Sequence, residues 1–149
     1  MNELYATDLV LWADQQAAAL RRRQANQIDW DNVAEEIENL ARSDRREIRN
    51  RLVVLCEHLL KWQYQPAGRS GSWRGSIREA RRQIADLIEE SPSLRPYPAA
   101  HLAWAYGHGR EQAEDNAGLL DLSPDCPWTV EQVLDRNFWP GLPWEGDQP

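Results

Sequence analysis

The chain has 149 residues, a net charge of −7 and a mean hydropathy of −0.73. This length is typical of one domain, which buries about two thirds of its unfolded surface and needs no disulfide or metal to fold. The acidic balance disfavours a general nucleic-acid binder, because phosphate backbones bind positive surfaces. The sequence has no signal pattern, no apolar run that approaches a membrane span and no metal-type cysteine spacing. We therefore expect a cytoplasmic protein without membrane contact, metal or cofactor.

The first predicted helix runs from about residue 8 to residue 23. Thr7 is expected to cap it, because a threonine hydroxyl accepts a hydrogen bond from a free N–H group of the first turn. Asp8 in the first turn and the three arginines at 21–23 in the last turn suit the helix dipole.

A long helix is predicted over residues 29–65, with Asp29 as its cap, because this stretch contains neither Gly nor Pro. Its apolar residues recur every three or four positions and predict a buried stripe. They are Val33, Ile37, Leu40, Ile48, Leu52, Leu55, Leu59 and Trp62. One gap of eight residues places Asp44 on this stripe. The alternatives are one long helix, straight or kinked near Ser43, and two helices that meet there; we favour the long helix.

The second half of the chain predicts three more helices. The first covers residues 73–90, with Trp73 and Ile77 on its apolar face. The second runs from about residue 96 to residue 117 and ends at Gly118, a favoured residue after a helix. Thr129 and Gln132 match a capping box and predict a short helix over residues 130–136.

An apolar tail follows, with the segments 138–140 and 143–144, and is expected to dock on the helices; residues 145–149 are expected to fray. The sequence therefore predicts an all-α, single-domain bundle of five or six helices over residues 1–149, with its core within about 5–140.

The strongest candidate for a site lies where the long helix ends. On a helix, His58, Lys61, Trp62 and Gln65 share one face. Trp73 and Arg74 begin the next helix just past a tight turn, so we expect all six residues to form one pocket. Such a pocket offers an imidazole for acid–base chemistry and a guanidinium for an anion. The interpretation that we favour is a helix junction in which these polar groups are satisfied structurally.

A second candidate is an anion-binding stripe beside the apolar face of helix 73–90. It consists of Arg74, Arg78, Arg81 and Arg82. Phosphate contact is one use for this stripe. Residues 29–38 carry five acids and no base, and residues 110–149 carry nine acids and two arginines. Pairing between helices is therefore the use that we favour.

Two possible metal sites have weaker support. Glu35 and Glu38 are neighbours on one helix face and could hold a cation with water, but pairing with arginines of neighbouring helices is the simpler interpretation. His101 and His108 are seven residues apart, and further ligands for a metal are missing from the pattern.

Several short motifs occur in one order along residues 5–140. They are Tyr5-Ala6-Thr7-Asp8, Asn32 to Glu38, His58 to Pro66, Ser72-Trp73-Arg74, Ser91-Pro92-Ser93-Leu94, Cys126-Pro127-Trp128 and Phe138-Trp139-Pro140. In this combination the chain resembles the bacterial domain of unknown function family twenty-nine. The resemblance implies an all-α fold and a bacterial cytoplasmic origin, and it implies no reaction, ligand or catalytic residue.

Two functions remain open from the sequence. The first is a non-catalytic protein-interaction or scaffold module that binds another protein through exposed indoles and the arginine stripe, since Trp and Arg are enriched in binding hot spots. The alternative is a hydrolase or nucleic-acid-processing enzyme in which His58 and Lys61 act and Arg74 clamps a phosphate. The oligomeric state and the identity of a partner stay open.

Overall fold

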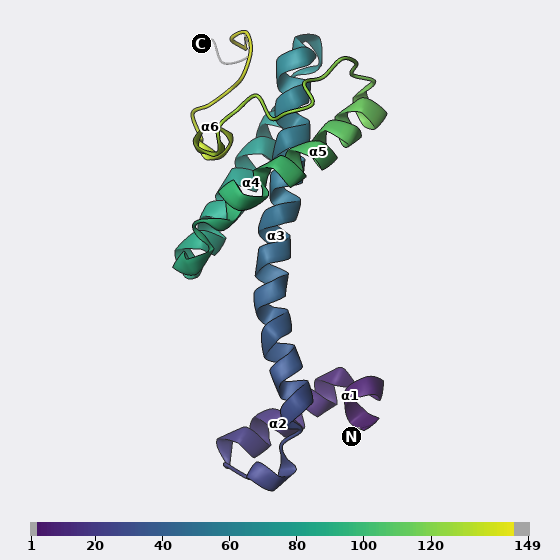
Figure 1. Ribbon diagram of the computed structural model, residues 1–149, viewed down its shortest axis with the longest axis vertical. Coiled ribbons are helices and arrows are strands. Elements are labelled where there is room, and N and C mark those ends of the chain that lie inside the picture. Colours follow the sequence, from purple (N-terminus) through teal and green to yellow (C-terminus); the bar gives the residue numbers. More distant parts are fainter. Residues whose placement is uncertain (1–2, 145–149) are drawn as a thin grey trace. The chain divides into compact units, whose positions relative to one another are not determined.

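The computed structural model describes residues 3–144, and within that range it is all-helical (Figure 1). The α-helices are α1 Glu3–Thr7, α2 Leu9–Arg21, α3 Trp30–Tyr64, α4 Gly71–Glu90, α5 Tyr97–Ala117 and α6 Val130–Leu134; the 3-10 turns are η1 Ala25–Gln27, η2 Pro66–Gly68 and η3 Pro92–Leu94. The all-α class and the number of five or six helices are confirmed, with six α-helices within residues 3–144. The predicted fraying of residues 145–149 lies outside the described residues.

The chain forms two compact units, Met1–Ser43 and Asp44–Pro149. The prediction of one domain over residues 1–149 stays a prediction. Helix α3 has 35 residues and contributes to both units as one unbroken ribbon (Figure 1). The prediction of a single long helix is therefore confirmed, and no second helix begins at Ser43.

In the N-terminal unit, Asp8 rather than Thr7 caps α2. The Asp8 carboxylate accepts from Leu11 N at 3.0 Å, whereas the Thr7 hydroxyl donates to the Glu3 carbonyl at 3.1 Å. Thr7 is the last residue of α1, a helix that the sequence analysis did not predict. The Thr7 hydroxyl is already hydrogen-bonded within α1, so it does not cap α2. Asp8, the next residue, caps α2 instead.

The buried face of α2 consists of Trp12, Gln16 and Ala19, and polar contacts join it to the chain that enters α3. Trp12 Nε1 donates to Asp29 Oδ2 at 3.1 Å, and Asp29 N donates to Gln16 Oε1 at 2.7 Å. The hydrogen bond from Asn32, together with that from Trp12, holds the pKa of Asp29 below its usual value. Tyr5 donates its hydroxyl to Glu36 Oε1 at 2.6 Å. These bonds fix α1 and α2 to the first turns of α3.

The core of the C-terminal unit is built on the second half of α3, against which α4 and α5 lie (Figure 1). Gly109 makes the approach of α5 possible, because a Cβ there would lie 2.7 Å from Cys56 Cβ and 2.9 Å from the Val53 carbonyl oxygen. Gly118 ends α5 with a φ of 66°, as the sequence predicts. Gly109 weakens α5 as an isolated helix, but it also lets α5 pack closely against α3.

The predicted buried stripe of α3 is buried only from Ile48 onward. Ile37 is 63% exposed and Leu40 is 71% exposed, so their prediction as core residues is wrong. Periodicity identifies which side chains share a helix face, but it carries no information about what covers that face.

Two shorter elements follow their local signals closely. Thr129 and Gln132 form the predicted capping box, and α6 ends at Leu134, two residues before the predicted end. Helix α4 begins two residues before the predicted start, because Ser70 accepts from Trp73 N at 3.3 Å and caps it.

Candidate functional site

The end of α3 places Trp62 at the centre of an aromatic cluster. Its ring lies 4.8 Å from that of Trp139 and 5.3 Å from that of Trp144, so the predicted docking of the tail is confirmed. Trp62 is 1% exposed, and its Nε1 has no hydrogen-bond partner among the described residues. The indole is thus a buried packing element and is not available to a protein partner.

Arginines surround this cluster. The Cζ atoms of Arg74, Arg78 and Arg81 lie 5.1, 5.9 and 5.4 Å from the centre of the Trp139 ring, and Arg74 is 5.4 Å from that of Trp144. Guanidinium groups at these distances are attracted to the face of an indole. The tail therefore covers three members of the predicted arginine stripe. The fourth, Arg82, pairs within α4 at 2.6 Å with Glu79 and at 2.9 Å with Asp86.

Arg81 is buried, and its Nε donates to the Val133 carbonyl at 2.8 Å. Burial lowers the pKa of this guanidinium to about 10, because the charge has lost its water. Carbonyl groups near the end of a helix attract positive charge, so Arg81 fixes the end of α6 to α4.

Arg69 connects the tail to the end of α3. Its Nε donates to the Trp62 carbonyl at 2.7 Å, its Nη2 to the Pro140 carbonyl at 3.4 Å and its Nη1 to the Leu142 carbonyl. Its Cζ lies 4.9 Å from the Trp62 ring. One guanidinium thus joins two segments that are far apart in the sequence.

The remaining members of the candidate pocket also have structural partners. His58 Nδ1 lies 2.9 Å from the Val54 carbonyl oxygen, and burial of the ring lowers the His58 pKa. Lys61 Nζ is 3.8 Å from Glu57 Oε1 and 4.9 Å from the centre of the Trp73 ring.

Gln65 Nε2 donates to the Ala117 carbonyl at 2.7 Å. The contacts thus bring Lys61 together with Trp73, and they bring Trp62 and Arg74 to the same two tail indoles. A shared pocket of all six residues stays a prediction.

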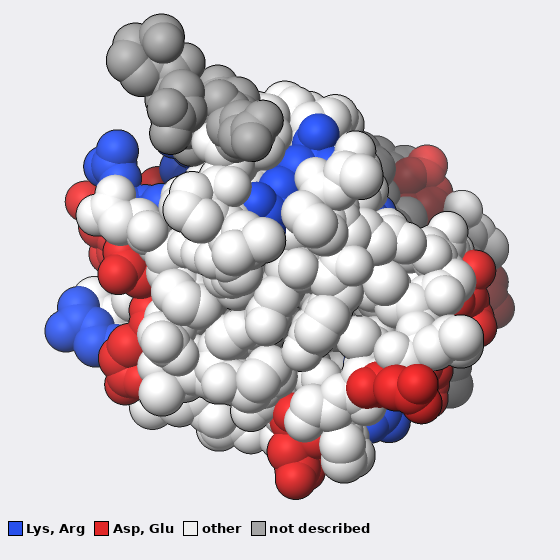
Figure 2. Space-filling view, turned by 90° about the horizontal axis from the view of Figure 1, so that it is seen from above, with Lys and Arg blue, Asp and Glu red and all other residues white. Residues whose placement is uncertain are grey.

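Charged groups are sparse on the face that is seen from above in Figure 2. Uncharged residues cover its centre, acidic residues stand mainly near its edge, and the blue groups form no continuous field among the described residues on this face. A broad polyanion-binding surface is therefore not formed on this face.

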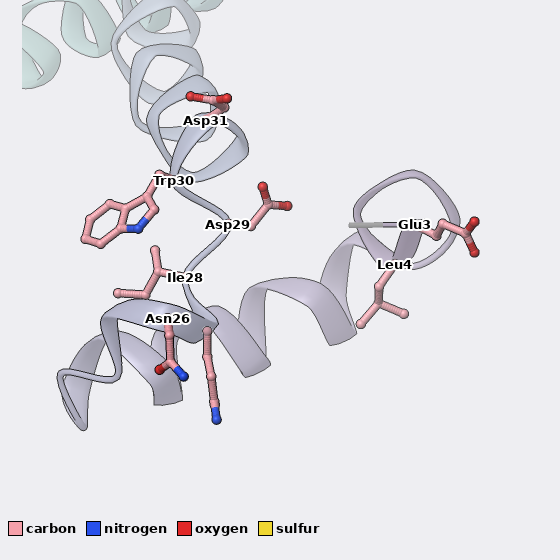
Figure 3. Close-up of a pocket in the computed structure, with 8 residues that line it drawn as sticks. Glu3, Leu4, Asn26, Ile28, Asp29, Trp30 and Asp31 are labelled. Carbon is pink, nitrogen blue, oxygen red and sulfur yellow. The ribbon is translucent and has the colours of Figure 1, made fainter. Parts of the chain in front are cut away.

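A hollow of about 670 Å³ lies in the N-terminal unit between α1 and the start of α3, and Figure 3 shows its lining. Trp30 and Ile28 extend to one side and Glu3 extends to the other, so its polar groups do not converge. The Asp29 carboxylate is already bonded to Trp12 and Asn32. This arrangement leaves Trp30 exposed beside Ile28 rather than enclosing a ligand.

Within residues 3–144, no cluster of three or more His, Cys, Asp or Glu side chains could hold a metal ion. Glu35 and Glu38 lie 3.1 and 3.9 Å from Arg42 Nη2. Arg42 belongs to α3, so the expected pairing with arginines of neighbouring helices is wrong. Side chains four positions apart on one helix are neighbours, and the long Arg42 side chain also reaches Glu35, seven positions away. No helix in the described part of the chain is long and apolar enough to cross a bilayer.

The exposed apolar residues of the N-terminal unit were not predicted from the sequence. Helix α2 has a second face, beside its buried one, that is apolar and exposed. It consists of Leu9, Val10, Ala13, Ala17 and Leu20, the α2 face. The signal was visible in the sequence, since apolar residues occupy more of α2 than one packed face needs.

The comparisons with known proteins add one assignment. No curated protein and no solved structure matches the chain. A family model matches residues 4–139, which is nearly the whole chain and covers most of both units. The chain therefore belongs to the family described as Domain of unknown function DUF29.

Proposed function

We propose that this protein is a non-catalytic protein-interaction module that binds its partner through the N-terminal unit. The observation that carries the proposal is where the exposed apolar residues lie. Seven of the eleven large apolar side chains exposed among the described residues belong to Met1–Ser43, the smaller unit. Clusters of exposed apolar side chains mark interaction sites, whereas scattered single ones are ordinary.

The small core of this unit supports the proposal. Of residues 3–43, only Trp12, Gln16 and Ala19 are buried. A segment of about 40 residues buries little apolar area and gains stability when it binds something else. A partner that covers the α2 face would supply the apolar contacts that the unit lacks.

The charges around the α2 face indicate the chemistry of the partner. Asp8, which caps α2, and Asp14 within α2 are both exposed, and no basic residue precedes Arg21. We infer that the partner protein presents an apolar patch with lysine or arginine at its edge, because opposite charges at the rim increase the association rate and exclude wrong partners.

The test compares three tagged versions of the chain in cells of its own organism. Val10→Glu/Leu20→Glu places two charges on the α2 face, and Leu120→Glu places one at a residue of the C-terminal unit that is also exposed. A partner that copurifies is then purified itself, and its binding is measured by calorimetry. We expect the wild type and Leu120→Glu to bind alike, and the double variant to bind at least about tenfold more weakly. Equal binding by all three proteins would contradict the proposal.

The proposal includes a bacterial cytoplasmic setting for the protein. A bacterial cytoplasmic setting fits the family resemblance, and Cys56 and Cys126 are free thiols. No observation on the described residues favours the alternative of an enzyme with a pocket around His58 and Arg74, so this alternative stays a prediction.

A further inference from the structure

The first half of α3 carries a second apolar surface, distinct from the α2 face. Trp30 is 58% exposed, and the α3 residues that follow it at intervals of three or four are exposed and apolar. Together they form the α3 stripe, which consists of Trp30, Ala34, Ile37, Leu40 and Ala41.

The α3 stripe continues the helix face that is buried later in the same helix. From Ala41, steps of three and four residues lead through Asp44 to Ile48 and Leu52, both fully buried. Helix α1 contacts α3 at Glu36, to which Tyr5 bonds, and this contact lies beside the α3 stripe, on the flank next to Leu40. The face suited to helix packing is therefore uncovered over about three turns.

A row of charges beside the α3 stripe changes sign along the helix. Asp31, Glu35 and Glu38 are followed, on the same flank, by Arg42 and Arg45. Arg42 pairs with the two glutamates of its own chain, but exposed pairs of this kind contribute little to stability and can exchange partners. The row is acidic before residue 40 and basic after it.

A second copy of α3 fits this pattern when it runs in the opposite direction. In an antiparallel pair with a two-fold axis, each flank faces the same flank of the partner, reversed end to end. With the axis near Leu40, the acidic part of each helix faces the basic part of the other. In a parallel pair, each flank would instead face the opposite flank of the partner at the same level, so the acidic and basic parts of this row would not face each other.

We propose that two copies of this protein associate through the α3 stripe as an antiparallel pair centred near Leu40. The apolar side chains supply the contact, and the reversal of charge selects the direction. This inference goes beyond the proposed function, because it concerns another face and another occupant.

Sedimentation equilibrium of the full chain over a range of concentrations tests the association. We expect a reversible dimer. Ile37→Glu/Leu40→Glu should raise the dissociation constant at least about a hundredfold, because four buried apolar side chains per dimer become charged. Glu35→Lys/Glu38→Lys, which keeps the α3 stripe, should raise it about tenfold. Val10→Glu/Leu20→Glu is the matched control and should dimerise like the wild type, with circular dichroism and melting temperature confirming that each variant folds.

The direction of the pair is tested by cross-linking single cysteines in a Cys126→Ser background with a short bis-maleimide; Cys56 is fully buried. In the antiparallel pair, the two copies of residue 41 lie roughly 3 Å apart along the axis, and those of residue 34 roughly 18 Å apart. Ala41→Cys should therefore cross-link and Ala34→Cys should not.

Three results would overturn the inference. The first is a monomer up to the solubility limit. The second is a dimer that Ile37→Glu/Leu40→Glu leaves intact, and the third is efficient cross-linking at both positions, which indicates a parallel pair. None of them bears on binding of a different protein by the α2 face, so the two proposals can fail separately.

Discussion

The two halves of α3 carry the same apolar spacing in different surroundings. After Ile48 the helix face is covered by the core of the C-terminal unit, and the tail adds two indoles over Trp62. Before Ser43 the same spacing leaves Ile37 and Leu40 exposed. The comparison shows that one amphipathic pattern can serve packing within a chain over one stretch and leave a surface for association over another.

The largest effect should come from a matched pair of substitutions within α3. Leu55→Ala removes a fully buried side chain and should lower the free energy of unfolding by about 2–5 kcal/mol. Leu40→Ala should change it by less than about 0.5 kcal/mol, since Leu40 is exposed. Urea denaturation at low protein concentration, where association does not contribute, measures both. Similar losses for both leucines would break the distinction between the two halves.

A second pair of variants examines how closely α5 approaches α3. Gly109→Ala adds a methyl group against Cys56 and the backbone of α3, and should lower the free energy of unfolding by about 1–3 kcal/mol. Gly107→Ala, in the same helix, has nothing within 4 Å of the added Cβ and should raise it by about 0.5–1 kcal/mol. Opposite signs in thermal denaturation would confirm the close contact. A stabilised Gly109→Ala protein would show that α5 packs more loosely.

A third variant tests the edge of the C-terminal unit. Thr129→Ala removes the hydroxyl that accepts from Gln132 N, which is one half of the capping box, and should cost about 1 kcal/mol in denaturant unfolding. Thr129→Ser keeps a hydroxyl at the same position and should stay close to the wild type. If the alanine variant is as stable as the serine variant, α6 is held mainly by Arg81 and not by its own cap.

The smallest expected effect concerns His58 and pH. Burial lowers the pKa of folded His58 below its ordinary value of 6.5, so the unfolded chain binds this proton more readily. The contribution to stability is therefore present above pH 6.5 and is lost as the pH falls through the folded pKa. His58→Gln should flatten this part of the melting-temperature curve between pH 7.5 and pH 5. If the curve of the His58→Gln protein is the same as that of the wild type, groups other than His58 cause the pH dependence.

Much of the fold could be predicted from local signals. The long helix follows from an uninterrupted stretch without Gly or Pro, and the end of α5 at Gly118 and the capping box at Thr129 each depend on a few adjacent residues; all three are confirmed. The exception is Thr7, where the unpredicted turn of α1 changes which residue caps α2. Local sequence rules therefore identify the cap of a helix correctly when the element next to that helix is also known.

The candidate site was harder to predict, because its neighbours come from distant parts of the sequence. The arginine row of α4 was visible from spacing, but not that Trp139, some 60 residues later, covers Arg74, Arg78 and Arg81. Likewise, spacing alone does not distinguish an exposed Leu40 from a buried Leu52. Which contacts form depends on how whole helices pack. The residue spacing within one segment does not show which distant segment covers it.

The attachment of the tail through Arg69 has a consequence for sequence change. The guanidinium bonds to the main-chain oxygens of residues 62, 140 and 142, and so recognises a path of the backbone rather than particular side chains. The side chain of Leu142 is exposed, so other residues can replace it among relatives with little loss of stability. Arg69 itself cannot be replaced at little cost, even by lysine, because an ammonium group lacks the planar fork that reaches all three oxygens. Among relatives whose chains continue past the matched residues 4–139, we therefore expect an invariant arginine at position 69 and a variable residue at position 142.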